Sequence, residues 1–151
     1  MPVYREKLWP SPWIFIIIGL VIPASLLVFA PISLLAGIST ATVLYLGSAL
    51  LFVLASPTVR VENGVLTAGK AQIETALLGE AIPIDGPEAT SERGPRLDAR
   101  AWLLIRGWVQ PVVRIPLEDP TDPSPYWLVS SRHPQKMAAA INGSRRPASS
   151  N

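Results

Sequence analysis

The 151-residue chain is 49% hydrophobic and 16% charged, with a formal net charge of +2 and no cysteine. The lack of cysteine excludes disulfides, thiolate metal sites and cysteine nucleophiles. After residue 59, eleven basic residues stand against ten acidic ones. The concentrated basic face that nucleic-acid binding needs is therefore missing, and that class of function is excluded.

Residues 8–59 contain no Asp, Glu, Lys, Arg or His, a charge-free run of 52 residues. A helix crosses a bilayer with about 20 apolar residues, so the run has room for two spans. Residues 13–30 form the first predicted transmembrane helix, about 27 Å long. Trp9 and Trp13 precede or begin it, where an interfacial aromatic belt is expected. Pro23 is expected to kink this helix.

Pro31 marks the turn into the second predicted transmembrane helix, residues 32–55, in which Gly37 and Gly47 would allow close approach of a second helix. One long tilted helix is the weaker alternative because Pro31 would lie near its midpoint. A cleaved signal peptide is a further alternative. The apolar run is too long for one, and no small-residue cleavage site is followed by polar sequence.

Two spans place both ends of the chain on one side of a membrane. The predicted outer turn has no charge, whereas four basic residues flank the other side: Arg5, Lys7, Arg60 and Lys70. The positive-inside rule then predicts a multi-pass protein of the cell membrane with both termini in the cytoplasm. Residues 1–12 would form a cytoplasmic N-terminal segment.

Residues 58–142 predict a small β domain. Apolar and polar residues alternate on both sides of Asn63-Gly64, a strong hairpin signal, and Gly69-Lys70 is a second turn. Further strand-length runs lie at residues 71–73, 76–84, 101–106, 112–117 and 126–131. Loops are expected at 86–100 and 118–125, a helix at 134–141, and a disordered tail at 143–151.

The predicted fold is thus a membrane α-helical hairpin followed by a small, mostly-β domain with a C-terminal helix. Several short strands followed by one helix describe a small antiparallel barrel or sandwich capped by the helix. This order of elements is similar to the pleckstrin-homology-type fold. This likeness concerns the fold alone and carries no function.

Three segments resemble one family: YREKLWP at residues 4–10, DARA at 98–101 and DPTDPSPYWLVSSR at 119–132. It is a family of small two-span membrane proteins of high-GC Gram-positive bacteria, catalogued as a domain of unknown function. The resemblance spans roughly residues 3–141. It implies a membrane hairpin with a cytoplasmic domain, and it brings no established activity or site.

The densest basic and aromatic cluster in the sequence consists of Arg93, Arg96, Arg100 and Arg106, with Trp102 and Trp108. Beside a membrane, this cluster is a candidate for contact with anionic lipid headgroups. Interleaved acidic residues dilute its charge, so a solvated loop is the simpler interpretation. Trp102 and Trp127 lie in apolar strands and are expected in the core.

The other candidate sites have simpler explanations. His133, the only histidine, precedes the last predicted helix and is expected to be an exposed residue near its start. Glu118, Asp119 and Asp122 crowd one turn, but their spacing matches no calcium loop. Asn142 begins a glycosylation sequon that a cytoplasmic tail would not use. No metal or cofactor is expected.

The sequence therefore predicts a non-catalytic, membrane-tethered interaction module that binds a protein partner or its own copies. A sensor of anionic lipid is the alternative, and an enzyme of unrecognised class is the second alternative. The lipid bilayer is the one partner that the composition itself implies.

Overall fold

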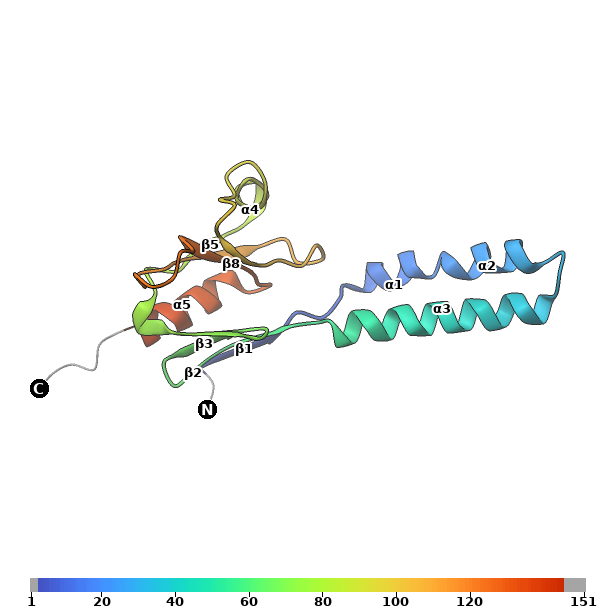
Figure 1. Ribbon diagram of the computed structural model, residues 1–151, viewed down its shortest axis with the longest axis horizontal. Helices are drawn as coiled ribbons and strands as arrows, with labels where there is room; N and C mark the ends of the chain where they lie inside the picture. Colours follow the sequence, from blue (N-terminus) through green and yellow to red (C-terminus); the bar gives the residue numbers. More distant parts are fainter. Residues whose placement is uncertain (1–2, 146–151) are drawn as a thin grey trace, which may run out of the picture. The chain divides into compact units, whose positions relative to one another are not determined.

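The computed structural model describes residues 3–145 (Figure 1). The chain divides into two compact units. One is built from the residues before Trp9 and after Ser56, and the other is Trp9–Ser56.

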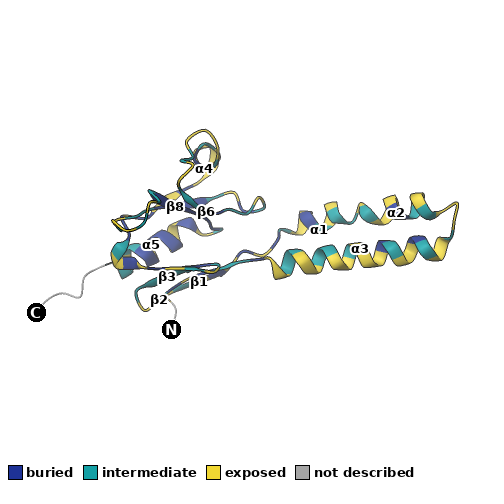
Figure 2. Cartoon of the chain, in the orientation of Figure 1, coloured by how far each residue is buried: buried dark blue, intermediate teal, exposed yellow. Residues whose placement is uncertain are grey.

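The smaller unit contains the apolar helices α1 (Pro12–Ile18), α2 (Val21–Phe29) and α3 (Leu34–Leu54). Pro12–Phe29 and Leu34–Leu54 have the length and composition of membrane spans, with mean hydropathies of 2.5 and 1.8. Only 6% and 11% of their most apolar windows are buried, so most of these side chains are exposed (Figure 2). The core helix of a soluble protein is mostly buried, and these helices differ from one in that respect. The two predicted apolar helices are confirmed.

The first apolar helix is interrupted at Gly19 and Leu20, one turn before Pro23. Proline has no N–H, so the Gly19 carbonyl lacks its usual donor four residues later. The Ile22 N–H donates to that carbonyl instead, at 3.1 Å. The kink expected at Pro23 therefore takes the form of a break in the helix one turn earlier, at Gly19 and Leu20.

Helices α2 and α3 pack side by side within this unit (Figure 1). The Ser33 hydroxyl caps α3 by accepting from the Ala36 N–H at 3.3 Å. Gly37 is buried, and a Cβ there would lie 3.3 Å from Leu26 Cδ2 of α2. A Cβ at Gly47 would meet nothing within 4 Å. Gly37 thus serves contact within the hairpin, and Gly47 faces open space.

The first sheet of the larger unit has the order β1 (Tyr4–Lys7), β2 (Thr58–Glu62), β3 (Val65–Ala68) and β4 (Ala71–Glu74), with every pair antiparallel. Both predicted turns are present, and Asn63, Gly64 and Gly69 have φ of 52°, 72° and 62°. Strand β1 comes from the segment that the sequence assigned to a separate N-terminal region. The helical hairpin is therefore an insertion between two neighbouring strands.

The second sheet has the order β5 (Ile82–Ile84), β7 (Val112–Pro116), β8 (Tyr126–Ser130) and β6 (Trp102–Leu104). The chain reverses direction between β6 and β7 and again between β7 and β8. Because β6 lies beside β8 rather than β7, the β6–β8 pair is parallel. The other pairs are antiparallel, so the sheet is mixed, unlike the antiparallel barrel or sandwich that the sequence indicates.

Two predicted segments differ locally from the structure. The run expected to form one strand at 76–84 begins inside the 3₁₀ turn η1 (Thr75–Leu77), and only its end forms a strand, β5. Helix α4 (Gly86–Arg93) replaces the first half of an expected loop. It is capped by the Asp85 carboxylate, which accepts from the Gly86 N–H at 2.7 Å. Proline follows at the next position, a favourable start for a helix.

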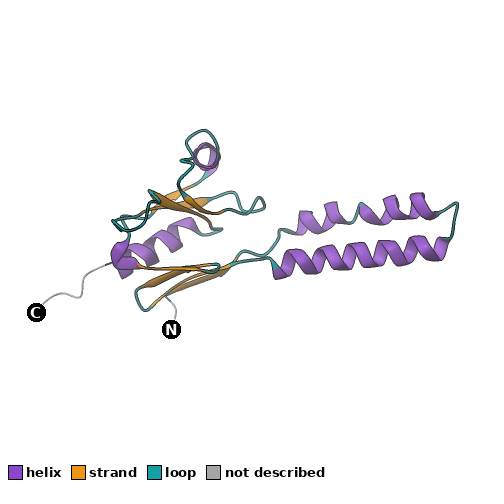
Figure 3. Cartoon of the chain, viewed as in Figure 1, coloured by secondary structure: helices purple, strands orange, loops and turns teal. Residues whose placement is uncertain are grey.

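Helix α5 (Pro134–Ser144) lies between the two sheets and contacts both (Figures 1 and 3). Met137 and Ile141 are fully buried with residues of both sheets in one core cluster. The helix runs past its expected end at Asn142-Gly143, so the predicted tail begins inside it. Residues 146–151 of that tail lie outside the described residues.

Replacing Gly37 with Leu is expected to destabilise the hairpin by about 1–3 kcal/mol because the new side chain overpacks the α2–α3 contact. Gly47→Leu adds the same apolar bulk in open space and is the matched control. Thermal unfolding of the full chain in detergent measures both. Equal effects of the two substitutions would contradict the assignment of Gly37 to the helix contact.

Candidate functional site

The four arginines predicted to contact lipid each have their own local partners. Arg93 donates to the Ala89 carbonyl at 3.3 Å and to Gln110 Oε1 at 2.5 Å. Arg106 Nη1 donates to the Ile105 carbonyl at 3.0 Å. These contacts occupy part of the hydrogen-bonding capacity that a headgroup would use, and lipid contact at this cluster stays a prediction.

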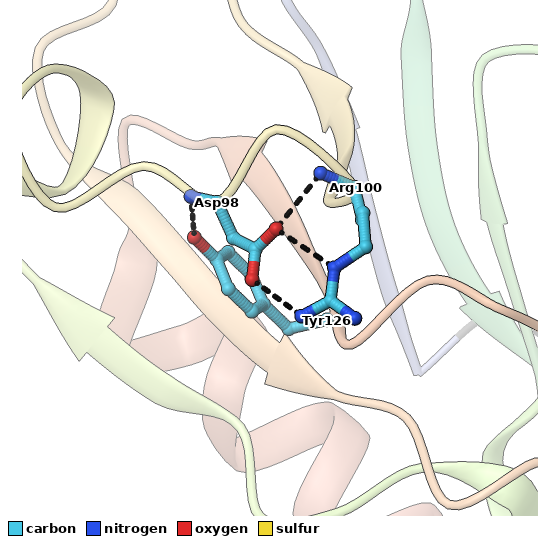
Figure 4. A network of polar contacts seen from close by, with 3 residues as sticks. All are labelled: Asp98, Arg100 and Tyr126. Carbon is cyan, nitrogen blue, oxygen red and sulfur yellow. Dashed lines mark hydrogen bonds and ion pairs between the residues drawn. The ribbon is translucent and has the colours of Figure 1, made fainter.

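Arg100 is held by Asp98 in a two-pronged contact (Figure 4). Its Nε and Nη2 donate to the two carboxylate oxygens at 3.2 and 3.0 Å, and its backbone N–H donates to Asp98 Oδ1 at 2.9 Å. These hydrogen bonds hold the pKa of the Asp98 carboxyl below its usual range. The Asp98 N–H donates to the Tyr126 hydroxyl at 2.9 Å, which ties this loop to β8. Arg100 therefore stabilises a loop conformation.

Glu92 of α4 is a buried carboxylate facing two cations. Its oxygens lie 3.9 Å from Arg96 Nη1 and 3.8 Å from Arg114 Nη1. Arg114 also lies over the Tyr126 ring, 4.4 Å from the centroid. Glu92 thus partly balances the charge of Arg96. From the sequence, Glu92 is expected only to dilute the positive charge of the cluster.

The remaining predicted sites have structural roles. His133 is exposed at the start of α5, as expected. Asp119 and Asp122 accept hydrogen bonds inside their own turn, at 2.9 Å from the Thr121 N–H and 2.8 Å from the Ser124 N–H. Within residues 3–145, no group of three or more His, Cys, Asp or Glu side chains is placed to hold a metal ion. Trp102 and Trp127 stack with ring centroids 4.3 Å apart.

A buried polar network joins β1 to the connection between β8 and α5. Glu6 Oε2 accepts from the Tyr4 hydroxyl at 2.5 Å and from Ser131 Oγ at 2.6 Å. Glu6 Oε1 accepts from the Arg132 N–H at 2.8 Å. Ser131 Oγ in turn accepts from the His133 N–H at 3.0 Å. Each carboxylate oxygen has a donor, which offsets the cost of burying the side chain.

A cationic groove of about 480 Å³ lies on the opposite, outer face of the first sheet. The strand register places Arg5 opposite Arg60, Arg60 opposite Thr67, and Thr67 opposite Gln72. Direct cross-strand partners share one face of a sheet, so these residues form a row. The groove lining consists of Arg5, Thr58, Arg60, Thr67, Gly69, Lys70 and Gln72.

The sequence does not reveal this groove because its two arginines are 55 positions apart. Arg5, Arg60 and Lys70 appear in the sequence only as charges flanking the apolar run. The available signal is the alternation within residues 4–7. In a strand it places Tyr4 and Glu6 on one face and Arg5 and Lys7 on the other.

Replacing Glu6 with Ala is expected to destabilise the β domain by about 2 kcal/mol because buried donors lose their acceptor. Unfolding of the full chain by urea in detergent, followed by tryptophan fluorescence, measures this loss. Exposed Glu80→Ala is the control and should change stability by less than about 0.5 kcal/mol. A Glu6 variant as stable as the control would contradict the role of the network.

Stability is also expected to fall at alkaline pH through Tyr4. Burial and the hydrogen bond to Glu6 raise the pKa of Tyr4 well above its ordinary value of 10.0. Above about pH 10, the folded protein therefore retains a proton that the unfolded chain releases. The contribution of Tyr4 to the free energy of unfolding is complete below about pH 10 and decreases as the pH rises above it. Tyr4→Phe should lose less stability than the parent as pH rises through that window. Identical pH profiles of unfolding would rule out this linkage.

A family model of proteins of unknown function, DUF3093, matches residues 3–141. No curated protein and no solved structure matches the chain. The match begins one residue before β1 and ends within α5, so it includes all the strands of the first sheet. The chain belongs to the DUF3093 family of proteins of unknown function.

Proposed function

We propose that this protein is a bacterial cell-membrane protein whose hairpin crosses the bilayer twice and holds the β domain in the cytoplasm as a non-catalytic interaction module. The observation that carries the proposal is the insertion of two exposed apolar helices between β1 and β2. A domain attached through two neighbouring strands is held at the membrane by two short connections rather than by one flexible linker.

The distribution of charge supports the orientation. The basic residues nearest the hairpin all belong to the β domain: Arg5, Lys7, Arg60 and Lys70. The connection between α2 and α3, residues 30–33, has no charge. Cytoplasmic segments carry the excess of Lys and Arg, so this asymmetry favours the domain side as cytoplasmic.

Exposed apolar groups on edge strands support an interaction role. Ile82 on β5 and Leu103 on β6 are 46% and 41% exposed, at the two edges of the second sheet. Sheet edges offer unpaired backbone groups to another chain. Gly47, which faces open space on α3, would allow a second copy to approach within the membrane. Strands followed by a closing helix also favour a pleckstrin-homology type of domain, from which the parallel β6–β8 pair is a departure.

Because the chain has no cysteine, single cysteines can test this topology. Ile32→Cys, between the helices, should react with a membrane-impermeant maleimide in intact cells. Ala99→Cys, in an exposed loop of the β domain, should react only after lysis. Gel shift of the labelled protein measures both. Labelling of Ala99→Cys in intact cells would refute the proposed orientation.

The same Ala99→Cys variant tests the interaction role when a cysteine-directed photocrosslinker is attached to it in permeabilised cells. One recurrent protein, or the chain itself, should be recovered in near-equal amount after purification in lipid discs. The Ile32→Cys protein, labelled on the other side, is the control for random capture. A chain that remains monomeric and without a crosslinked partner contradicts the module.

A further inference from the structure

We infer that the cationic groove on the first sheet binds a phosphate group, with the headgroup of an anionic lipid as the source nearest to it. The phosphate chemistry follows from the groove alone, whereas the lipid source rests on the proposed membrane location. The groove is separate from the predicted cluster at Arg93 to Arg106 and shares no residue with it.

The charge of the groove is only partly balanced by neighbouring acids. Arg5 and Arg60 are direct cross-strand partners, and like charges in that position repel each other. Arg60 has one acid nearby, with Nη1 3.9 Å from Glu62 Oε2 on the solvent-exposed face. Among residues 3–145, neither Arg5 nor Lys70 has a carboxylate within ion-pair distance. A bound anion would offset this repulsion.

The neutral lining and the size of the groove fit a phosphate ester. Thr58, Thr67 and Gln72 add hydroxyl and amide donors beside the cations. Planar guanidinium groups bind phosphate oxygens through paired hydrogen bonds, and lysine adds a compact charge. A groove of about 480 Å³ has room for a phosphate with a small substituent.

The charges of this face are segregated along the strands. Lys70 lies in the turn whose Gly69 N–H donates to the Thr58 carbonyl at 2.9 Å, so it belongs to the end of β2 that follows the helices. Glu62 and Glu74 lie at the other end of the strands. Only residues 55–57 separate α3 from β2, a reach of at most about 15 Å. The basic end therefore lies within reach of lipid phosphates.

The test measures binding to the full-length protein in an uncharged detergent, by native mass spectrometry and thermal shift. The probes are phosphatidylglycerol, phosphatidylcholine and inorganic phosphate. We expect phosphatidylglycerol to bind and stabilise the protein in preference to phosphatidylcholine. The double variant Arg5→Gln, Arg60→Gln should bind it about thirtyfold more weakly, from the contribution of two surface cations.

The matched control is the double variant Lys136→Gln, Arg145→Gln, which removes the same charge from α5 and its C-cap, outside both the groove and the Arg93–Arg106 cluster, and should retain binding. Stabilisation by inorganic phosphate that equals that by the lipid would identify a free phosphate as the ligand. Equal losses in both double variants, or no response to either anion, would overturn the inference. If the groove double variant does not fold, Lys70→Gln replaces it, with an expected loss of about fivefold.

Binding and membrane location can fail independently. Inorganic phosphate is tested in detergent solution, so its result does not depend on where the hairpin resides. If the protein has the proposed topology but responds to neither anion, the membrane-tethered module stands and the phosphate site in the groove is refuted. If the protein binds phosphate but has the opposite topology, the phosphate site stands and the membrane lipid is refuted as its source.

Discussion

The antiparallel pairing of β1 with β2 is the constraint on which the other features depend. Its register, from Tyr4 opposite Val61 to Lys7 opposite Thr58, joins segments on either side of the whole apolar run. The same register turns Tyr4 and Glu6 inward and Arg5 and Lys7 outward. A slip of one residue would bury the cations and expose the buried carboxylate, so both faces of the sheet depend on this one pairing.

The helical hairpin lowers the loss of conformational entropy that this long-range pairing requires. A flexible loop of this length would lose conformational freedom on closure. The α2–α3 packing already returns the chain on itself, with Gly37 allowing the close approach. Each unit thus supports the other through the covalent connections: the hairpin brings the strand segments together, and the paired strands hold both ends of the hairpin in one domain.

The charged residues of the β domain divide into two classes by how they are satisfied. Glu6 and Glu92 are both buried. Hydrogen-bond donors satisfy both carboxylate oxygens of Glu6, whereas Glu92 has two guanidinium groups nearby and no hydrogen bond to its Oε2. Arg100 is paired with Asp98 at the surface, where such a pair contributes little to stability. The groove is the contrasting case, because its cations face one another with few acids. Unbalanced charge, rather than the number of arginines in a segment, separates a binding surface from a solvated loop.

By itself the sequence determined the two apolar helices, both tight turns of the first sheet, the burial of Trp127 and the C-terminal helix. Each of these follows from local composition: a charge-free run, glycine where φ is positive, or apolar residues at a regular spacing. Only the tertiary structure decided that residues 4–7 form a strand, that β6 and β8 are parallel, and that Arg5 lies beside Arg60. Those features depend on which segments become neighbours. The paired residues are 25 positions apart in β6 and β8 and more than fifty apart in β1 and β2, and pairing over such separations leaves no periodic signal along the chain.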